Sequence, residues 1–351
     1  MKFGLFDHVD RSDRPLAQQL DERLAFVAAA DDAGFYCYHV AEHHSTPINM
    51  VPVPGVYLGA VARQTKRIRL GPLVYLLPFH SPLRVIEEIC ILDHLSHGRL
   101  EVGVGRGTSP FEMNFHQVDV EHSREVFIDA FDCLVAGLTH DRLNYAGPYY
   151  SYSGVPMPLQ PLQRPYPAFW YGSRNETGST WAGERGMHFT SSGAGTLARS
   201  NITAFRAALA KRGGPDVPHP EFSGGTAIGV MREIVVADTD VEARRIAKPA
   251  HDHLYANQTF LRREHAAGRI GEVPVAVTPT TRAGQFEDAI AEGSTIVGTP
   301  ETVRAAIARQ VEELGINYLI GYFMFGTMTL ADALRSLRLF AAEVMPKLAD
   351  L

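Results

Sequence analysis

The sequence predicts an α/β protein and, within that class, a (β/α)8 TIM barrel with insertions. The first reason is that strand-like apolar runs alternate with helix-periodic segments along the chain, which favours a parallel sheet. The second is the count: eight such repeats occur in 351 residues, which suits a barrel better than a doubly wound sheet. We therefore expect one domain over residues 1–351.

The eight expected strands are short apolar segments, each followed by a helical pattern. They cover residues 2–6, 35–40, 68–77, 99–104, 168–171, 187–191, 227–236 and 318–323. Helices are indicated by apolar residues three and four positions apart, most clearly at Phe127, Ala130, Phe131, Leu134 and Leu138. Further helices are expected after Pro15, over 56–63, over 83–95 and from Leu330 to Val344.

Two stretches do not follow this repeat. Residues 145–167 are rich in proline and tyrosine and are expected to be irregular. Residues 262–293 mix glycine, proline and charged residues without a long period of either kind. Because long loops in compact domains are usually functional or disordered, we expect a lid-like insertion at about 262–293.

Composition excludes several classes of partner. With 33 basic and 39 acidic side chains the net charge is −6, the wrong sign for a protein that tracks nucleic-acid phosphates. The first residues turn charged at Asp7, so neither a signal peptide nor a membrane span is expected. The cysteines, Cys37, Cys90 and Cys133, stand far apart and read as reduced core residues. We therefore expect a cytoplasmic protein without a membrane partner.

The first candidate catalytic residues are Glu42, His43 and His44, which follow the second expected strand. Active groups of such barrels lie at the carboxyl ends of the strands. Histidine titrates near neutrality and suits general acid or base work, while a carboxylate can orient a ring. The alternative is a polar loop cluster without a catalytic role. No metal is expected, because Asp7-His8-Val9 lacks the His-x-His pair usual on the first strand of metal-dependent barrel hydrolases.

Candidate phosphate-binding residues follow the fourth strand in Gly105-Arg106-Gly107. Glycines permit close backbone approach, and an arginine can form a fork with a phosphate. A dinucleotide fingerprint is excluded, because Thr108-Ser109-Pro110 breaks the chain and the next helix is expected near Glu121. Arg124 lies on the barrel-facing side of that helix, where a buried cation needs an anionic partner. The alternative is an exposed arginine in the first turn that reaches sideways to Glu121 or Glu125.

A third candidate phosphate element follows the fifth strand. Residues 171–180 are small and hydroxylic, and they include Ser173, Asn175, Thr177 and Gly178. Free N–H groups at a helix N-terminus suit a phosphate, although N-capping alone would explain this composition. Two arginines and one helix terminus from three successive units together predict one phosphate site.

The order and spacing of these motifs resemble the bacterial luciferase-like family of flavin-dependent monooxygenases. The motifs that carry the resemblance are Met1-Lys2-Phe3-Gly4, Glu42-His43-His44, residues 92–99, Gly105-Arg106-Gly107, Ser123-Arg124, residues 181–186 and residues 297–301. The resemblance implies a (β/α)8 fold and reduced FMN (FMNH2) supplied by a separate NAD(P)H-dependent flavin reductase. It also implies attack of a flavin peroxide, formed with molecular oxygen, on an organic substrate, and a homodimer.

The resemblance also assigns individual residues. His43 matches the family's catalytic histidine, and Arg106 and Arg124 match its phosphate-binding arginines. Leu73-Val74 matches a peptide beneath the flavin ring that is cis in luciferases. Where luciferases have a cysteine this chain has Gly105, so light emission is not implied.

A second departure concerns the phosphate. The luciferase phosphate-binding serine and threonine fall on Asn175 and Gly178, which leaves Thr177 or backbone N–H groups as substitutes.

We therefore interpret the chain as an FMNH2-dependent monooxygenase of a small, largely apolar substrate, with His43 as acid or base and Glu42 and His44 orienting. Aromatic residues that could line the substrate cavity are Phe6, Tyr75, Phe79 and Phe111. Three alternatives stay open: an F420-dependent hydride-transfer enzyme of the same family, a flavin-binding protein without turnover and a metal-dependent barrel hydrolase.

Overall fold

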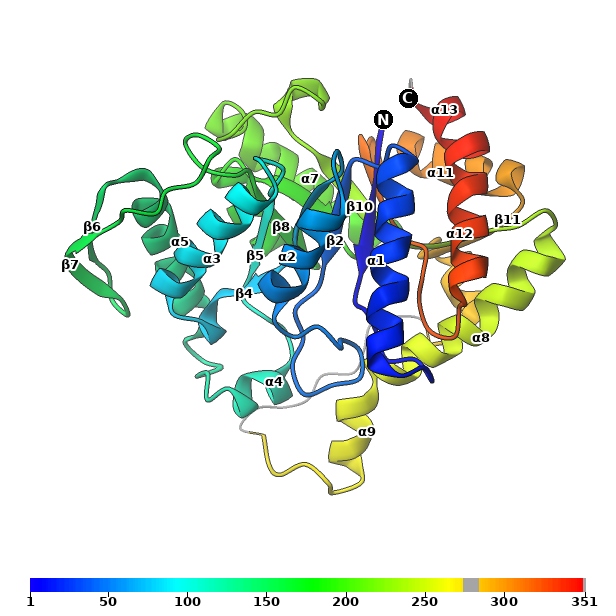
Figure 1. The fold of residues 1–351 in the computed structure, drawn as a ribbon, viewed down its shortest axis with the longest axis horizontal. Coiled ribbons are helices and arrows are strands. Elements are labelled where there is room, and N and C mark those ends of the chain that lie inside the picture. The colour runs from blue at the N-terminus through cyan, green and yellow to red at the C-terminus, as the bar shows by residue number, and fades with distance from the viewer. Residues whose placement is uncertain (274–283, 350–351) are drawn as a thin grey trace.

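The computed structural model describes residues 1–273 and 284–349 and shows a parallel β-barrel surrounded by helices (Figure 1). The strands of the barrel are β1 (Lys2–Asp7), β2 (Cys37–Val40), β3 (Arg69–Pro72), β4 (Tyr75–Leu76), β5 (Val102–Gly105), β8 (Phe169–Ser173), β9 (His188–Ser191), β10 (Ile228–Val236), β11 (Thr295–Gly298) and β12 (Tyr318–Tyr322). Their order is β3-β2-β1-β12-β10-β9-β8-β5-β4, with β11 paired to β10. A parallel bridge between Leu70 and Leu100 brings the two ends of this order together. The predicted barrel is confirmed.

The helices bury the apolar faces that their sequence periodicity predicts. They are α1 (Leu16–Asp32), α2 (Pro54–Gln64), α3 (Pro82–Leu95), α4 (Pro110–Phe115), α5 (Ser123–Thr139), α6 (Glu176–Glu184), α7 (Gly195–Arg212), α8 (Asp240–Gln258), α9 (Phe260–Ala266), α10 (Phe286–Ala291), α11 (Pro300–Leu314), α12 (Leu330–Leu339) and α13 (Met345–Leu348). Phe127, Phe131 and Leu134 of α5, for example, are all buried, as expected for an apolar stripe facing the sheet.

The expected strand over 68–77 is two strands in the structure. β3 pairs with β2 and β4 pairs with β5, so the chain changes its neighbour between them. The prediction merged them because a continuous apolar run does not show where a strand changes partner. The structure also adds β11, which pairs with the last four residues of β10, from Glu233 to Val236. The nine residues of β10 are long enough to pair with β12 along one part and β11 along another.

The stretch expected to be irregular at 145–167 contains part of an antiparallel hairpin. Its strands, β6 (Arg142–Ala146) and β7 (Ser151–Pro156), project from the side of the barrel (Figure 1). Most of their residues are exposed or half-buried, so the hairpin carries no apolar run of the kind that predicts a strand.

The segment expected to be an irregular lid-like insertion is helical at both ends. α9 ends at Ala266, inside the first part of the segment, and α10 begins at Phe286, near its end. Both helices are too short to show a clear helical periodicity of apolar residues. The His265 ring of α9 lies 5.4 Å from the Phe111 ring of α4, at the end of the barrel where both helices appear in Figure 1. Residues 274–283, the centre of the expected insertion, lie outside the described residues.

The cysteines and the absence of a membrane span were also expected from the sequence. Cys37, Cys90 and Cys133 are buried and unpaired. A membrane-crossing helix would need a long apolar stretch, and none of the helices in the described part of the chain has one.

Candidate functional site

A cavity of about 460 Å³ opens at the carboxyl ends of the barrel strands. This volume lies within the range of small-molecule and cofactor sites. Ten of the residues selected from the sequence line it: Glu42, His43, Leu73, Val74, Arg106, Arg124, Ser173, Asn175, Thr177 and Gly178. His44 is not part of the wall. Residues from several separate βα units thus line one cavity.

The aromatic residues expected to line the substrate cavity divide into two pairs. Phe6 and Phe79 are in the cavity wall. Tyr75 and Phe111 are not: the Tyr75 hydroxyl donates to Oε1 of Glu88 at 2.6 Å, and Phe111 packs beside His265 of α9. Both rings are buried, so their apolar character serves packing rather than the cavity.

His43 is paired with a carboxylate that the sequence analysis did not select. Its Nδ1 lies 3.2 Å from Oε1 and 3.3 Å from Oε2 of Glu112. The His43 side chain is 33% exposed, whereas that of Glu112 is 4% exposed. Burial alone would lower the pKa of His43, but the Glu112 carboxylate outweighs it and raises that pKa. Burial likewise raises the pKa of Glu112, yet the interaction with His43 lowers it overall.

Glu112 was missed because Thr108-Ser109-Pro110 was expected to interrupt regular structure, whereas α4 begins at Pro110. In the structure Pro110 is the first residue of α4, and the Ser109 Oγ accepts a hydrogen bond from the Glu112 N–H at 3.3 Å. Proline is common at the first position of a helix, and Ser-x-x-Glu is the pattern of a capping box. The Ser-x-x-Glu pattern from Ser109 to Glu112 was therefore the sequence signal from which the start of α4 could have been predicted.

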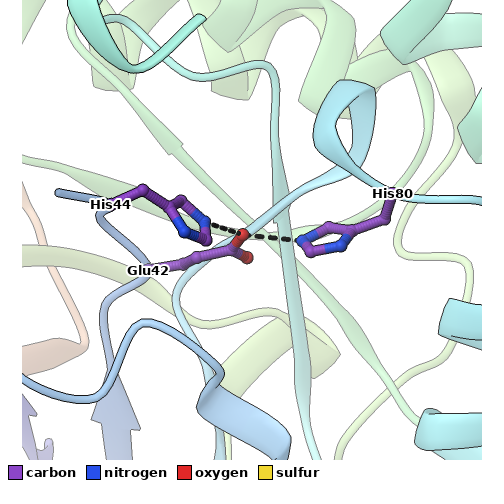
Figure 2. Close-up of side chains that lie close together, drawn as sticks. All are labelled: Glu42, His44 and His80. Carbon is purple, nitrogen blue, oxygen red and sulfur yellow. Dashed lines mark hydrogen bonds and ion pairs between the residues drawn. The ribbon is translucent and has the colours of Figure 1, made fainter. Parts of the chain in front are cut away.

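Glu42 orients two other histidines rather than His43 (Figure 2). Its Oε1 accepts hydrogen bonds from Nε2 of His44 at 2.8 Å and Nε2 of His80 at 2.6 Å, and its Oε2 accepts from the Leu76 N–H at 3.0 Å. Side chains of an extended chain alternate in direction, so residues 42 and 44 share one side and His43 faces the other. Glu42 therefore bonds to the rings of His44 and His80 and acts on His43 only through space.

The Glu42 carboxylate is stabilised in its charged form by these partners. Burial would raise the pKa of Glu42, but the hydrogen bonds from His44 and His80 lower it. Burial opposes the protonated form of His80, yet the bond to Glu42 raises the pKa of His80. Since His80 lies 38 residues further along the chain, only the fold shows that it belongs to this cluster.

Glu42, His44 and His80 are also a possible donor set for a metal ion, with ligand atoms within 4.8 Å of one another. Their N–O distances of 2.6 and 2.8 Å are hydrogen-bond lengths. Donor atoms bound at about 2.0–2.1 Å around a tetrahedral zinc would stand about 3.3 Å apart. The geometry is therefore that of a hydrogen-bonded cluster.

Two arginines, Arg106 and Arg124, also line the cavity. The Arg106 guanidinium donates to Ser123 Oγ at 3.4 Å, beside Arg124 at the start of α5. Both guanidinium groups act on the Tyr171 phenol: burial raises the pKa of Tyr171 while the two cations oppose that rise. Within residues 1–273 and 284–349, no carboxylate lies within 4.0 Å of Arg106 or Arg124. Two such cations facing a cavity fit an anionic group such as a phosphate.

The N-terminus of α6 borders the same cavity. Asn175 caps the helix, its Oδ1 accepting from the Gly178 N–H at 2.8 Å, and the Ser173 Oγ donates to the Asn175 carbonyl at 2.8 Å. A Cβ atom on Gly178 would lie 2.9 Å from Ser173 Oγ, so a glycine is required for this close packing. The capping interpretation of Asn175 is confirmed, and Thr177 and the first N–H groups of α6 are the groups left for a phosphate.

Leu73 and Val74 form an apolar part of the wall, and the peptide bond between them is cis, as the resemblance implies. A Cβ atom on Gly105 would lie 2.5 Å from Cγ2 of Val74. A side chain at position 105 would therefore collide with Val74 unless the Val74 side chain moved.

Two relatives match almost the whole chain. The chain is 34% identical over 347 residues to the uncharacterized protein y4wF of Sinorhizobium fredii, covering 99% of this chain and 97% of that protein. It is 26% identical over 371 residues to 2,5-diketocamphane 1,2-monooxygenase 1 of Pseudomonas putida, covering 99% of both.

Solved structures share the fold at low identity. The monooxygenase RslO1 of Streptomyces bottropensis matches with a TM-score of 0.85 at 23% identity, over 99% of both chains. The oxygenating constituent of 3,6-diketocamphane monooxygenase of Pseudomonas putida, in complex with FMN, matches with a TM-score of 0.77 at 23% identity, also over 99% of both. The coenzyme F420-dependent tetrahydromethanopterin reductase of Methanopyrus kandleri matches with a TM-score of 0.72 at 16% identity, again over 99% of both.

Residues 1–318 match the family model described as luciferase-like monooxygenase. This match covers most of the chain and confirms the family that the motif order indicates. The chain therefore belongs to the luciferase-like monooxygenase family and is an oxidoreductase that depends on a flavin-type cofactor.

Proposed function

We propose that the protein is the FMNH2-dependent oxygenase component of a two-component monooxygenase. It would oxygenate a small, largely apolar organic substrate with molecular oxygen and receive its flavin from a separate NAD(P)H-dependent reductase. The observation that carries this proposal is the cavity itself. Its wall presents Arg106 and Arg124, whose guanidinium groups lack a carboxylate within 4.0 Å among the described residues, together with the hydrogen-bonded pair His43–Glu112.

FMN matches this distribution of charge, since it combines a phosphate with a flat, largely apolar ring system. Arg106, Arg124, Thr177 and the first N–H groups of α6 would hold the phosphate. Leu73 and Val74 would support the ring. When bound and reduced, the flavin supplies the electrons that activate oxygen.

His43 would hold or transfer a proton at an oxygen atom beside the ring, because its side chain is partly exposed and lines the cavity. Glu42 would keep the loop that carries His43 in place, through its bonds to His44, His80 and the Leu76 N–H. Apolar side chains in the same wall, Phe6, Leu76 and Phe79, support a largely apolar substrate and would exclude water from it.

The names of the relatives suggest the first substrates to test. One relative is named for 2,5-diketocamphane and another, from Rhodococcus erythropolis, for limonene. A compact ketone and an alkene of this size are both compatible with a cavity of 460 Å³ shared with a flavin ring.

An F420-dependent hydride transfer is the second candidate, because an F420-dependent reductase shares the fold. The decisive experiment titrates the purified protein with FMN, FMNH2 and reduced F420, and then follows oxygen uptake and incorporation of labelled oxygen from ¹⁸O2 into cyclic ketones and limonene. We expect the protein to bind FMNH2 and to form product that contains ¹⁸O. Binding of F420 with substrate reduction and no oxygen uptake would establish the alternative, and FMN binding without turnover of any substrate would indicate a carrier.

We further propose that the protein is a cytoplasmic homodimer. Exposed apolar side chains on α2 and α3 support a dimer, since Val56 is 77%, Ile91 46% and Leu95 36% exposed. Light scattering should give twice the chain mass, and V56E combined with I91E should give a monomer. Three buried, unpaired cysteines are compatible with a reducing compartment, which cell fractionation tests.

A further inference from the structure

We propose that Glu112 is a positioning residue, which keeps a proton on Nδ1 of His43 and so directs Nε2 of that ring into the cavity. This inference rests on the acid or base role proposed for His43. It assigns to α4, at the cavity wall, a function that neither the sequence motifs nor the family match contains.

The hydrogen-bond geometry carries the argument. An ionised carboxylate can only accept, so the Nδ1 atom that lies 3.2 Å from Glu112 Oε1 must bear the hydrogen. In the other tautomer a lone pair on Nδ1 would face a negative charge that is almost fully buried. The tautomer with hydrogen on Nδ1 leaves Nε2 of the neutral ring as the basic atom, on a side chain that lines the cavity.

A second contact fixes Glu112 relative to the loop. The His44 backbone N–H donates to Glu112 Oε2 at 2.8 Å, so one carboxylate holds both the ring of residue 43 and the backbone of residue 44. The carboxylate is in turn fixed by the N-terminus of α4, where Ser109 caps the Glu112 N–H. A surface ion pair would lack this second anchor and would fluctuate between partners.

The other titratable or charged groups around His43 are differently engaged. The His8 ring lies 5.6 Å from the His43 ring, and Arg106 lines the same cavity. Glu42 acts on His43 through space, while its carboxylate oxygens accept from His44, His80 and the Leu76 N–H. In the described ranges, Glu112 is thus the carboxylate in direct contact with His43, and it is the group whose removal should change the His43 titration most.

The test compares Glu112→Gln and Glu112→Asp with a control, Glu88→Gln. Glu88 also accepts a hydrogen bond from a ring residue, Tyr75, but is not part of the cavity wall. The first measurement is an NMR titration of ¹⁵N-labelled histidine in the flavin-free protein, with the His43 signal identified by its loss in His43→Ala. In Glu112→Gln we expect the His43 midpoint to move to lower pH and the two ring nitrogens to share the proton; in Glu88→Gln neither should change.

The second measurement is product formation as a function of pH. Glu112→Gln should lower the rate at least ~10-fold, move the limb of the profile that reports His43 to lower pH, and leave FMN affinity within about twofold. Glu112→Asp should retain the NMR tautomer and recover part of the rate.

An unchanged His43 midpoint and tautomer in Glu112→Gln would overturn the positioning role. If the NMR changes occur but wild type oxygenates no substrate, the proposed function fails while the role of Glu112 in fixing the ring stands. If Glu112→Gln does not fold, Glu112→Asp decides instead. This variant keeps the carboxylate, so we expect the proton to stay on Nδ1 of His43, and loss of that preference would overturn the positioning role.

Discussion

Histidines lie close to carboxylates in two regions of this barrel, and the pKa values of these histidines shift in opposite directions in the two regions. At the carboxyl ends of the strands, Glu112 faces His43 and Glu42 faces His80, and the pKa of each histidine is raised. In the buried core, His39 and His188 lie close enough to Glu101 to be affected by its charge. Burial is the largest influence there and lowers the pKa of both rings to about 4, even though Glu101 opposes it.

The difference comes from the hydrogen-bond partners. The Glu101 carboxylate accepts from Arg69, Tyr36 and Trp170. The two core histidines contact neutral groups instead: His39 Nε2 lies 3.0 Å from the Tyr318 hydroxyl, and His188 Nδ1 accepts from the Ala227 N–H at 3.0 Å. Of these four histidines, the two whose rings bond directly to a carboxylate, His43 and His80, have raised pKa values, and the two core histidines have lowered ones. Glu101 thus belongs to a buried network in the core, whereas Glu112 bonds to a histidine of the cavity wall.

The largest effect should come from breaking the buried network around Glu101. Glu101→Gln removes the charge that pairs with Arg69, whose side chain is only 16% exposed, and should lower the free energy of unfolding by about 3–5 kcal/mol. Denaturant unfolding followed by circular dichroism measures this loss. A loss under about 1 kcal/mol would show that this network is not a main source of stability.

Removing the cavity histidine should affect chemistry rather than folding. His43→Ala is expected to lower product formation at least ~100-fold, the scale of a positioned acid or base. Flavin affinity and the unfolding midpoint should stay close to wild type. Rapid-mixing oxidation of FMNH2 with product analysis measures the effect, and a normal product yield would remove His43 from the mechanism.

The part of the cavity wall that holds Arg106 and Arg124 should respond to ligand charge. Each charged contact contributes about 1.5–3 kcal/mol, so Arg106→Ala or Arg124→Ala should weaken FMN binding about 10- to 150-fold. Riboflavin, which has no phosphate, is the matched control ligand and should bind wild type and variants alike. Equal losses for the two ligands would mean that the arginines shape the cavity instead.

Acid should destabilise the protein through the core histidines. A folded-state pKa of about 4 for His39 and His188 lies below the ordinary 6.5, so the unfolded chain binds more protons between these values. Their contribution to stability is present above pH 6.5 and is lost as pH falls toward 4, by about 2 kcal/mol per histidine between pH 7 and pH 5. Unfolding free energies at several pH values test this, and His188→Gln should flatten the dependence.

The smallest effect is expected at His44. Its ring bonds to Glu42 and lies outside the cavity wall, so His44→Ala should reduce turnover less than ~10-fold. A loss as large as that of His43→Ala would transfer the catalytic assignment from one histidine to the other.

Much of this arrangement was predictable from local pattern. Apolar periodicity identified the strands and helices of the barrel, with the helix from Phe127 to Leu138 as the clearest case, because each element must bury one face. Glu42, His43, Arg106 and the residues from Ser173 to Gly178 were found because they follow strands of the barrel, whereas Arg124 was selected from its place on the next helix and Leu73-Val74 from the family resemblance. Glu112 was missed because α4 was not expected, and His80 was missed although it follows the expected strand over 68–77.

The sequence by itself determined the barrel, the family and the positions of His43, Arg106 and Arg124, because periodicity, strand ends and motif order are all local properties of the chain. The tertiary structure alone decided which carboxylate bonds to which histidine. Glu42 is adjacent to His43 in the chain but bonds to His44 and His80, while Glu112, 69 residues away, bonds to His43. Hydrogen bonds depend on distance and direction in space, and these follow from the folding of βα units against one another rather than from proximity along the chain.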